Sequence, residues 1–339
     1  MKNLTIPGRI LITLLFVGFL YGIKWLVLDS GYVLNKEANR PEVTQQNGAP
    51  YAPPSESNAP AATATPVNQT QPGFNYAPPA VANGKLKGVV ELGASGFNSF
   101  IIKVDDQRNW KLEKSEFGNS LVLENMATDD DIRAGLKKYI GGMLDFGVSG
   151  KDIHFVVSSG AAKAENTNKI SRALKQLNYV VNQVTPEQEG TLGLKTVLPD
   201  AYAQNAFVAD IGSGNTKISW MENGKVTALE SYGSKYFQDQ IDGQKVYEAV
   251  SAKVKQIPQA HRATCFIIGG IPFEMAKEVR QGKERYTVLK APGAYQLENA
   301  KSKAGINIYK AIADGTGCQQ FVFDWDANFT IGFLLDLPL

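Results

Sequence analysis

The sequence predicts an α/β fold with two related lobes, preceded by one transmembrane helix and a disordered Pro-rich linker. From residue 85 onward, short apolar runs typical of strands alternate with segments of helical periodicity. A unit of strand, Gly-rich turn and strand occurs twice, and its acidic residue recurs about 119 positions later. A sharp change in composition separates this part of the chain from an apolar N-terminal run. The expected parts are a tail over 1–9, a membrane span over 10–28, a linker over 29–84 and a domain over 85–339, with lobes over about 85–203 and 204–339.

The N-terminal run, residues 10–28, contains a single charged side chain, Lys24, close to its end. At a rise of about 1.5 Å per residue, a helix of this length is roughly 28 Å long, which matches the hydrocarbon core of a bilayer. A cleaved signal peptide is the main alternative, but no small-x-small cleavage site follows in residues 29–32. We therefore expect a single-pass anchor in a lipid bilayer, most simply a bacterial inner membrane.

The orientation of this anchor depends on basic residues that are nearly balanced across the span. Lys2 and Arg9 precede it, and Lys36 and Arg40 follow it. The positive-inside rule is therefore close to a tie. The short N-terminal tail is typical of a cytoplasmic N-terminus, which slightly favours a main domain outside the cytoplasm and leaves the other orientation open.

The linker is recognised by its prolines and its lack of charge. Nine of the 16 prolines fall within residues 41–84, where Glu42 and Glu56 are the only charged side chains. Such a stretch buries too little apolar surface to offset the entropy cost of ordering it. As a flexible coil, these residues would have an end-to-end distance of roughly 35–40 Å.

The whole-chain composition excludes several classes of protein. The formal net charge of +2 gives no broad basic surface, so we expect no nucleic-acid partner. Two cysteines and two histidines are too few for a disulfide scaffold or a zinc-finger framework.

In the first lobe, a strand at 86–90 and a second at 97–104 flank the Gly-rich turn that begins with Glu91. Later elements are expected as helices near 128–147 and 163–177 and strands at 153–157 and 179–184.

The second lobe repeats the pattern, with strand, Gly-rich turn and strand over 206–220 and Asp210 closing the first strand. The expected elements after it are helices near 243–256, 273–280 and 304–312, a buried strand at 264–268 that opens into Gly269 and Gly270, and a terminal hairpin of strands at 321–325 and 329–333. The alternation indicates mostly buried sheets.

The paired hairpins carry the chemistry. A tight Gly-rich turn directs successive backbone N–H groups into one concavity, which suits phosphate oxygens. A carboxylate at a strand end can hold Mg²⁺, which neutralises phosphate charge. Two such hairpins facing each other could grip a polyphosphate from both sides. Each signal alone is more often only a turn or a solvated acid, and a Walker-type loop is absent.

These segments resemble the actin, heat-shock chaperone and sugar-kinase ATPase superfamily, a two-lobed fold of the ribonuclease H type. Within it, the chain is most similar to the exopolyphosphatase/guanosine pentaphosphate phosphohydrolase (Ppx/GppA) family. Residues 91–97, 210–216 and 268–270 match its first phosphate, second phosphate and adenosine motifs, and residues 184–190 match the segment that supplies its water-activating glutamate.

The resemblance implies a phosphoanhydride hydrolase that acts on polyphosphate, (p)ppGpp or a nucleoside triphosphate with Mg²⁺. It implies that Glu189 orients the attacking water and that Glu91 and Asp210 hold the metal ion. The residues implied to bind phosphate or nucleotide are Gly93, Ser95, Gly96, Gly212, Ser213, Gly214, Asn215, Thr216, Gly269 and Gly270.

Departures from the family pattern keep a non-enzymatic alternative open. Glu91 stands where the family has Asp, and Gln188 replaces one acid of the pair that includes Glu189. Residues 289–305 resemble bacterial actin-like proteins of the plasmid-segregation type, which polymerise. The alternative is therefore a catalytically weak or inactive actin-like scaffold or filament protein at the membrane, with self-association or a membrane-complex partner.

Overall fold

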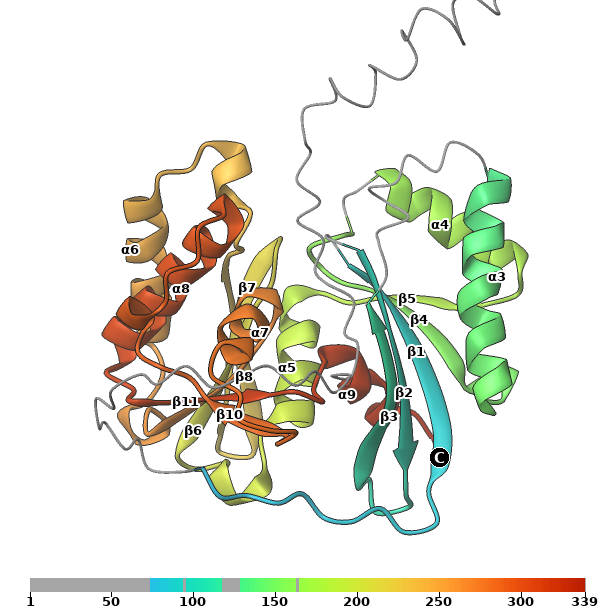
Figure 1. Cartoon of the computed structure of the whole chain (residues 1–339), viewed down its shortest axis with the longest axis horizontal. Coiled ribbons are helices and arrows are strands. Elements are labelled where there is room, and N and C mark those ends of the chain that lie inside the picture. Colours follow the sequence, from blue (N-terminus) through green and yellow to red (C-terminus); the bar gives the residue numbers. More distant parts are fainter. Residues whose placement is uncertain (1–73, 94–95, 118–128, 163–164, 339) are drawn as a thin grey trace, which may run out of the picture. The chain divides into compact units, whose positions relative to one another are not determined.

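The computed structural model describes residues 74–93, 96–117, 129–162 and 165–338. The predicted span at 10–28, most of the predicted linker and Ser95 lie outside these ranges. Among the helices of the described ranges, none is both long and apolar enough to cross a membrane. The described elements form two separate sheets with helices around them, so the prediction of a mixed α/β fold is confirmed (Figure 1).

The first sheet has the strand order β3-β2-β1-β4-β5. Its strands are β1 (Lys85–Gly93), β2 (Gly96–Val104), β3 (Trp110–Phe117), β4 (Ile153–Val157) and β5 (Val181–Gln183). β1 pairs antiparallel with β2 and parallel with β4, so the hairpin and the later strand meet at the centre of the sheet. Helices α3 (Asp129–Phe146) and α4 (Glu165–Gln176) cover one face, where Leu136 and Leu174 pack on Phe155 in one buried cluster.

The second sheet has the strand order β10-β11-β9-β6-β7-β8. Its strands are β6 (Ala206–Ile211), β7 (Asn215–Glu222), β8 (Lys225–Tyr232), β9 (Thr264–Ile268), β10 (Tyr286–Val288) and β11 (Gln320–Asp324). β6 pairs antiparallel with β7 and parallel with β9, which repeats the arrangement of β1, β2 and β4. Helices α6 (Gly243–Val254), α7 (Gly270–Lys277) and α8 (Ala300–Thr316) pack around it. α8 begins before the predicted position because Asn299 caps it and accepts a hydrogen bond from Ser302 N at 2.7 Å.

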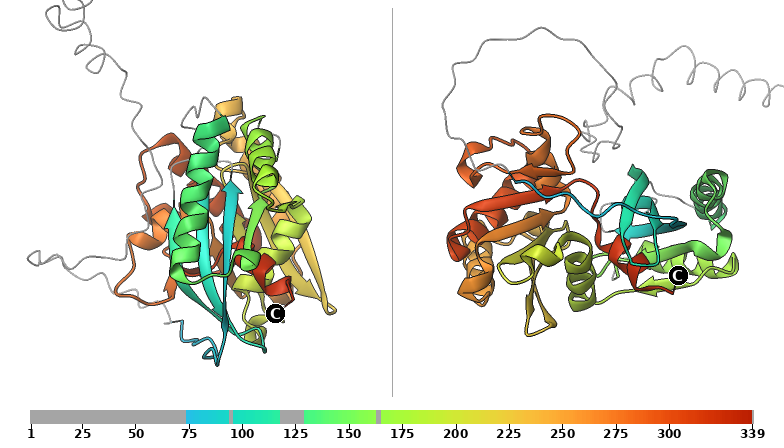
Figure 2. Two further views of the ribbon diagram at one scale, coloured as in Figure 1. Left: turned by 90° about the vertical axis from the view of Figure 1, so that its right-hand side faces the viewer. Right: turned by 90° about the horizontal axis from the view of Figure 1, so that it is seen from below.

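One helix, α5 (Pro186–Val197), contacts both sheets and lies between them in Figures 1 and 2. Its Leu192 joins the cluster on the first sheet with Val89, whereas Leu194 joins the cluster on the second sheet with Phe266. A capping box between Thr185 and Gln188 fixes its first turn. Its N-terminal turn is therefore held in a defined position between the two lobes.

The predicted terminal hairpin is wrong. β11 is a strand, but residues 329–333 belong to helix α9 (Phe329–Asp336), which Asn328 caps. Phe329, Ile331 and Leu334 are buried against the first sheet, so the chain returns to the first lobe at its end. A short run that is apolar on nearly every position fits a buried strand and a buried helix equally well, and only the available packing surface decides between them.

Residues before β1 also pack onto the folded part. The ring of Phe74 lies 5.5 Å from that of Phe266 and 5.2 Å from that of Tyr286, measured between centroids. Phe74 falls within the segment that the sequence assigned to the linker. The part of the chain ordered against the second sheet thus starts upstream of residue 85.

Candidate functional site

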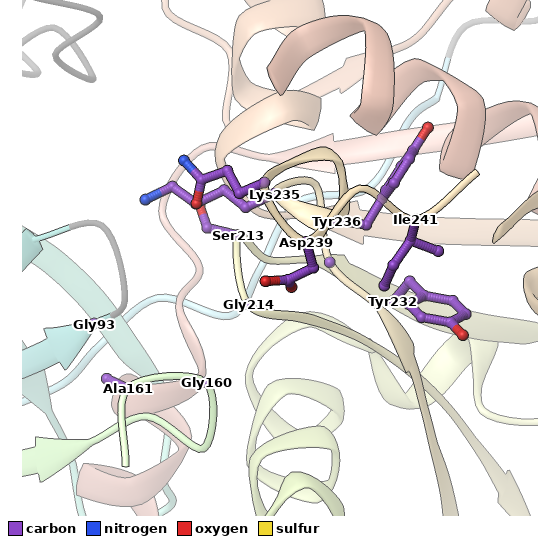
Figure 3. A pocket seen from close by; sticks show the side chains of 12 residues that line it. Gly93, Gly160, Ala161, Ser213, Gly214, Tyr232, Lys235, Tyr236, Asp239 and Ile241 are labelled. Carbon is purple, nitrogen blue, oxygen red and sulfur yellow. The ribbon is translucent and has the colours of Figure 1, made fainter. Parts of the chain in front are cut away.

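A cavity of about 360 Å³ lies between turns of the two sheets (Figure 3). From the first sheet, Gly93 at the end of β1 and Gly160 and Ala161 beyond β4 line it. Facing them are Ser213 and Gly214 in the turn between β6 and β7, and a segment from Tyr232 to Ile241 that includes Lys235. The cavity therefore occupies the place where the sequence predicted two opposed Gly-rich turns.

Backbone segments pack closely against one another around this cavity. A Cβ atom on Gly214 would lie 3.0 Å from the Cα atom of Gly160 in the opposite lobe. A Cβ atom on Gly233 would collide with backbone atoms of Gly214 and Asn215. Only glycine lets the turn between β6 and β7 approach both neighbours this closely.

The most buried acidic group beside the cavity is Glu189, on the first turn of α5, with 3% of its side chain exposed. Its Oε2 atom accepts hydrogen bonds from Ser159 N at 2.9 Å and from Ser159 Oγ. Its Oε1 atom forms an ion pair with Lys217 Nζ. Both oxygens of the carboxylate predicted to orient water are thus engaged by the protein itself.

Lys217 is the basic partner of two carboxylates. It lies on β7 directly opposite Asp210 in the β6–β7 hairpin, and its Nζ atom is 3.6 Å from Asp210 Oδ2. Burial alone would lower the pKa of Lys217, but the negative charges of Asp210 and Glu189 outweigh it and raise the pKa. The ammonium therefore stays charged although only 4% of its side chain is exposed.

Glu91 stands apart from this ion pair. Its Oε2 atom accepts hydrogen bonds from Asn98 Nδ2 at 2.9 Å and from Asn328 Nδ2 at 3.0 Å. Burial raises the pKa of Glu91 to about 7, the charge of Glu189 adds to the rise, and the two amide donors oppose it.

Asn215 and Thr216 serve the framework of the site. Asn215 Nδ2 donates to Ser159 Oγ at 2.9 Å and to Glu230 Oε1 at 2.7 Å, which ties the turn to the opposite lobe. Thr216 Oγ1 donates to Tyr232 O at 2.7 Å. The polar atoms of both buried side chains are thus directed to other residues of the protein.

The other residues predicted to bind phosphate fall into two groups. Gly93, Ser213 and Gly214 line the cavity. Gly212 precedes Ser213 in the turn between β6 and β7. Gly96 pairs with Gly93 at the start of β2, and Gly269 and Gly270 begin α7 outside the cavity lining. The structure therefore brings Gly93 of the first phosphate motif and the turn of the second to one cavity, with the glycines of the third motif at the start of α7.

Two half-buried lysines add positive charge on the side of the second sheet. Lys235 lines the cavity, and Lys301 Nζ lies 3.9 Å from the position that a Cβ atom on Gly270 would take. Burial lowers the pKa of both ammonium groups, and for Lys301 the charge of Lys235 lowers it further while Glu274 opposes. An anion entering the cavity would relieve this cost at Lys235, which lines it.

Sequence reasoning missed Lys217, Ser159, Asn98 and Asn328 as site residues. A signal for Lys217 existed, because the two-strand unit over 206–220 pairs it with Asp210 across a short turn. Ser159 and Asn328 come from segments far from the motifs they contact, and no local pattern reveals such partners.

The Mg²⁺ ion implied by the resemblance does not fit this set of side chains. A divalent ion between Asp210 and Glu189 would meet the ammonium of Lys217, and Glu91 holds two amide donors on one oxygen. Within the described part of the chain, no three His, Cys, Asp or Glu side chains are grouped so that they could hold a metal ion. The metal-binding role predicted for Glu91 and Asp210 finds no support in this arrangement.

Comparison with known proteins places this architecture among phosphatases. A family model described as the Ppx/GppA phosphatase family matches residues 97–302. The structure of a Ppx/GppA family member from Aquifex aeolicus is similar with a TM-score of 0.57 at 17% identity, over 74% of this chain and 96% of the other. That of an exopolyphosphatase from Cytophaga hutchinsonii is similar with a TM-score of 0.60 at 14% identity, over 74% of this chain and 98% of the other. No curated protein matches the sequence.

Proposed function

Because this chain belongs to the Ppx/GppA phosphatase family, we propose that it is a membrane-anchored phosphoanhydride hydrolase that removes phosphate from polyphosphate or from a nucleotide such as pppGpp or ATP. The observation that carries the proposal is the cavity between the Gly-rich turns of the two lobes, with Lys235 on one wall and Glu189 behind Ser159. This matches what hydrolysis of a phosphate chain needs: a narrow backbone cradle, positive charge and a carboxylate near the reacting group.

The phosphate chain would lie along the turns, with Gly93 and Gly160 on one side and Ser213 and Gly214 on the other. The ammonium of Lys235 would contact its non-bridging oxygens, which carry the negative charge. The small residues Gly93, Gly160 and Gly214 would let the phosphates approach the backbone closely, while Tyr232 and Tyr236 line the other part of the cavity.

Hydrolysis would begin with attack of a water oxygen on the terminal phosphorus, in line with the bridging oxygen that leaves. The new P–O bond forms as the old one breaks, so inorganic phosphate and a chain shorter by one phosphate result. Glu189 would orient this water and take up its proton. For that, its carboxylate has to loosen one contact with Ser159 or Lys217 when the ligand binds.

The test is release of phosphate from polyphosphate, pppGpp and ATP by the full-length protein in detergent. Glu189→Gln should lower kcat by about 10²–10⁴-fold, which is the usual contribution of a positioned base. Glu187→Gln is the matched control, since Glu187 is an exposed carboxylate on the same helical turn. Phosphate release from none of the three substrates, or equal rates for the two variants, would contradict the proposal.

The anchor is the second part of the proposal, and residues 10–28 support it by their length and lack of charge. The full-length protein should remain in the membrane fraction after alkaline extraction, whereas a chain without residues 1–28 should be released. Reporter fusions at Leu339 would then establish on which side the domain lies, with the outside of the cytoplasm as the expected result. Release of the full-length chain by alkali would refute the anchor.

A catalytically silent scaffold is the second candidate function. The specific observation in its favour is that both oxygens of Glu189 are engaged by Ser159 and Lys217. In that case the protein should bind pyrophosphate or ATP without turnover and should pellet or capture a membrane partner only when the ligand is present.

A further inference from the structure

The ammonium of Lys217 occupies the position at which this site would be expected to hold a metal ion. Its side chain is 4% exposed, and it enters the space between Asp210 and Glu189 from the strand that pairs with Asp210. These two carboxylates come from different parts of the fold, the end of β6 and the first turn of α5. One ammonium therefore bridges the second sheet and the central helix.

The ammonium also lies directly beneath the turn that faces the cavity. A Cβ atom on Gly212 would be 3.5 Å from Lys217 Nζ. The positive charge is thus placed one backbone layer behind Ser213 and Gly214, which line the cavity. At this depth little water screens charges, so the ammonium offsets part of the negative charge of Asp210 and Glu189 that an anion in the cavity would otherwise feel.

We infer that Lys217 is the resident cation of this site: its ammonium holds the position between Asp210 and Glu189 that a divalent ion would need, and the protein binds its phosphoryl ligand without a protein-bound metal ion. Mg²⁺ requires near-octahedral oxygen ligands at about 2.0–2.1 Å, and a lysine that already pairs with both carboxylates blocks that geometry. The ammonium supplies one fixed positive charge with three N–H donors instead of two charges with open coordination positions. The inference concerns the same site as the proposed function, but it is tested by metal binding, so either can fail without the other.

Lys217→Gln should therefore create a metal site. Removing the ammonium leaves two buried carboxylates without a counter-charge, which is a strongly unfavourable arrangement that a divalent cation would relieve. The carboxamide of glutamine is shorter and adds an oxygen that can serve as a ligand.

The experiment is titration of the full-length protein in a non-ionic detergent with Mn²⁺ alone, followed by electron paramagnetic resonance of the free ion. The wild-type protein should show no stoichiometric Mn²⁺ site. Lys217→Gln should bind one Mn²⁺ per chain, at least about tenfold more tightly than the wild-type protein does. The additional change Glu189→Gln should abolish the gained site. Lys87→Gln is the matched control, because Lys87 is also a buried strand lysine but donates to the backbone oxygen of Pro338 at 2.6 Å.

A wild-type protein that binds one Mn²⁺ stoichiometrically, and loses it in Asp210→Asn, would overturn the inference. A folded Lys217→Gln protein that binds Mn²⁺ no better than Lys87→Gln would overturn it as well. Should Lys217→Gln fail to fold, the wild-type titration still decides. If Lys217 occupies the cation position, the wild-type protein has no Mn²⁺ site there. If the position is open to a metal ion, the wild-type protein binds one Mn²⁺, and Asp210→Asn removes that site.

Discussion

Asn328 Nδ2 donates a hydrogen bond to Glu91 Oε2 at 3.0 Å, across 237 positions of the sequence. The same side chain caps α9, since Asn328 Oδ1 accepts from Thr330 N at 2.8 Å and from Thr330 Oγ1 at 2.7 Å. The amide therefore couples the last helix to the first phosphate-motif hairpin. Through this contact, the C-terminal segment takes part in positioning the site.

Replacing Asn328 by alanine removes the helix cap and one donor to Glu91. We expect the free energy of unfolding to fall by about 1–3 kcal/mol, since a lost cap and a lost hydrogen bond to a carboxyl group each cost roughly 1–2 kcal/mol and do not add fully. Denaturant unfolding checks this. Asn328→Asp is the informative partner, because it keeps the cap but sets a second carboxylate against Glu91. The free energy of unfolding of Asn328→Asp should fall more at pH 8 than at pH 5. Equal losses at the two pH values would show that the contact with Glu91 does not contribute to stability.

The pKa of Glu91, raised to about 7 from 4.5, makes stability depend on pH. Between these two values, the folded protein keeps a proton that the unfolded chain has released. This contribution is therefore fully present below pH 4.5 and is lost as the pH rises through 7. Glu91→Gln cannot ionise and keeps an oxygen that accepts from Asn98 and Asn328. It should be more stable than wild type by about 1–3 kcal/mol at pH 8 and indistinguishable at pH 4.5. A wild-type stability that rises between pH 5 and 8 relative to this variant would contradict the assignment.

Gly233 is the glycine at which we expect the largest effect of a single methyl group. A Cβ atom there would collide with the backbone of the turn between β6 and β7, which cannot move away as a flexible side chain could. Gly233→Ala should lower the free energy of unfolding by about 3 kcal/mol or more. Gly293→Ala is the control, because its Cβ atom would meet nothing within 4 Å. The two variants are compared by thermal unfolding, and similar midpoints would refute the packing described for the turn.

Phe74 tests where the ordered domain begins. Its ring contacts those of Phe266, Tyr202 and Tyr286, with centroids 5.2–5.5 Å apart. Phe74→Ala should cost about 1–3 kcal/mol, which is less than a fully buried ring would because Phe74 is only partly buried. Asn75→Ala, the exposed neighbour, should leave the unfolding transition unchanged. If Phe74→Ala also left it unchanged, the domain would begin no earlier than β1.

The alternation of strands and helices, the repeated hairpin and the glycines of both phosphate motifs were predictable because each is a local pattern. Period-two and helical periodicities reflect which side chains face a core, and a Gly-rich turn between two apolar runs needs no distant partner. The repeat was readable for the same reason, and the structure gives β1, β2 and β4 the same arrangement as β6, β7 and β9. The resemblance that rested on these patterns led to the correct family.

The partners of the acidic residues were decided only in three dimensions. Glu189 meets Ser159 and Lys217 because α5 packs between the two sheets, and Glu91 meets Asn328 because α9 packs on the first sheet. The apolar run at 329–335 became a helix rather than a strand since the first sheet offered it a face to cover. The sequence by itself determined the two Gly-rich motifs, and residues of both line one cavity. Tertiary structure decided which charged side chains lie next to these motifs, because burial and long-range contact, unlike periodicity, are properties of the packed chain.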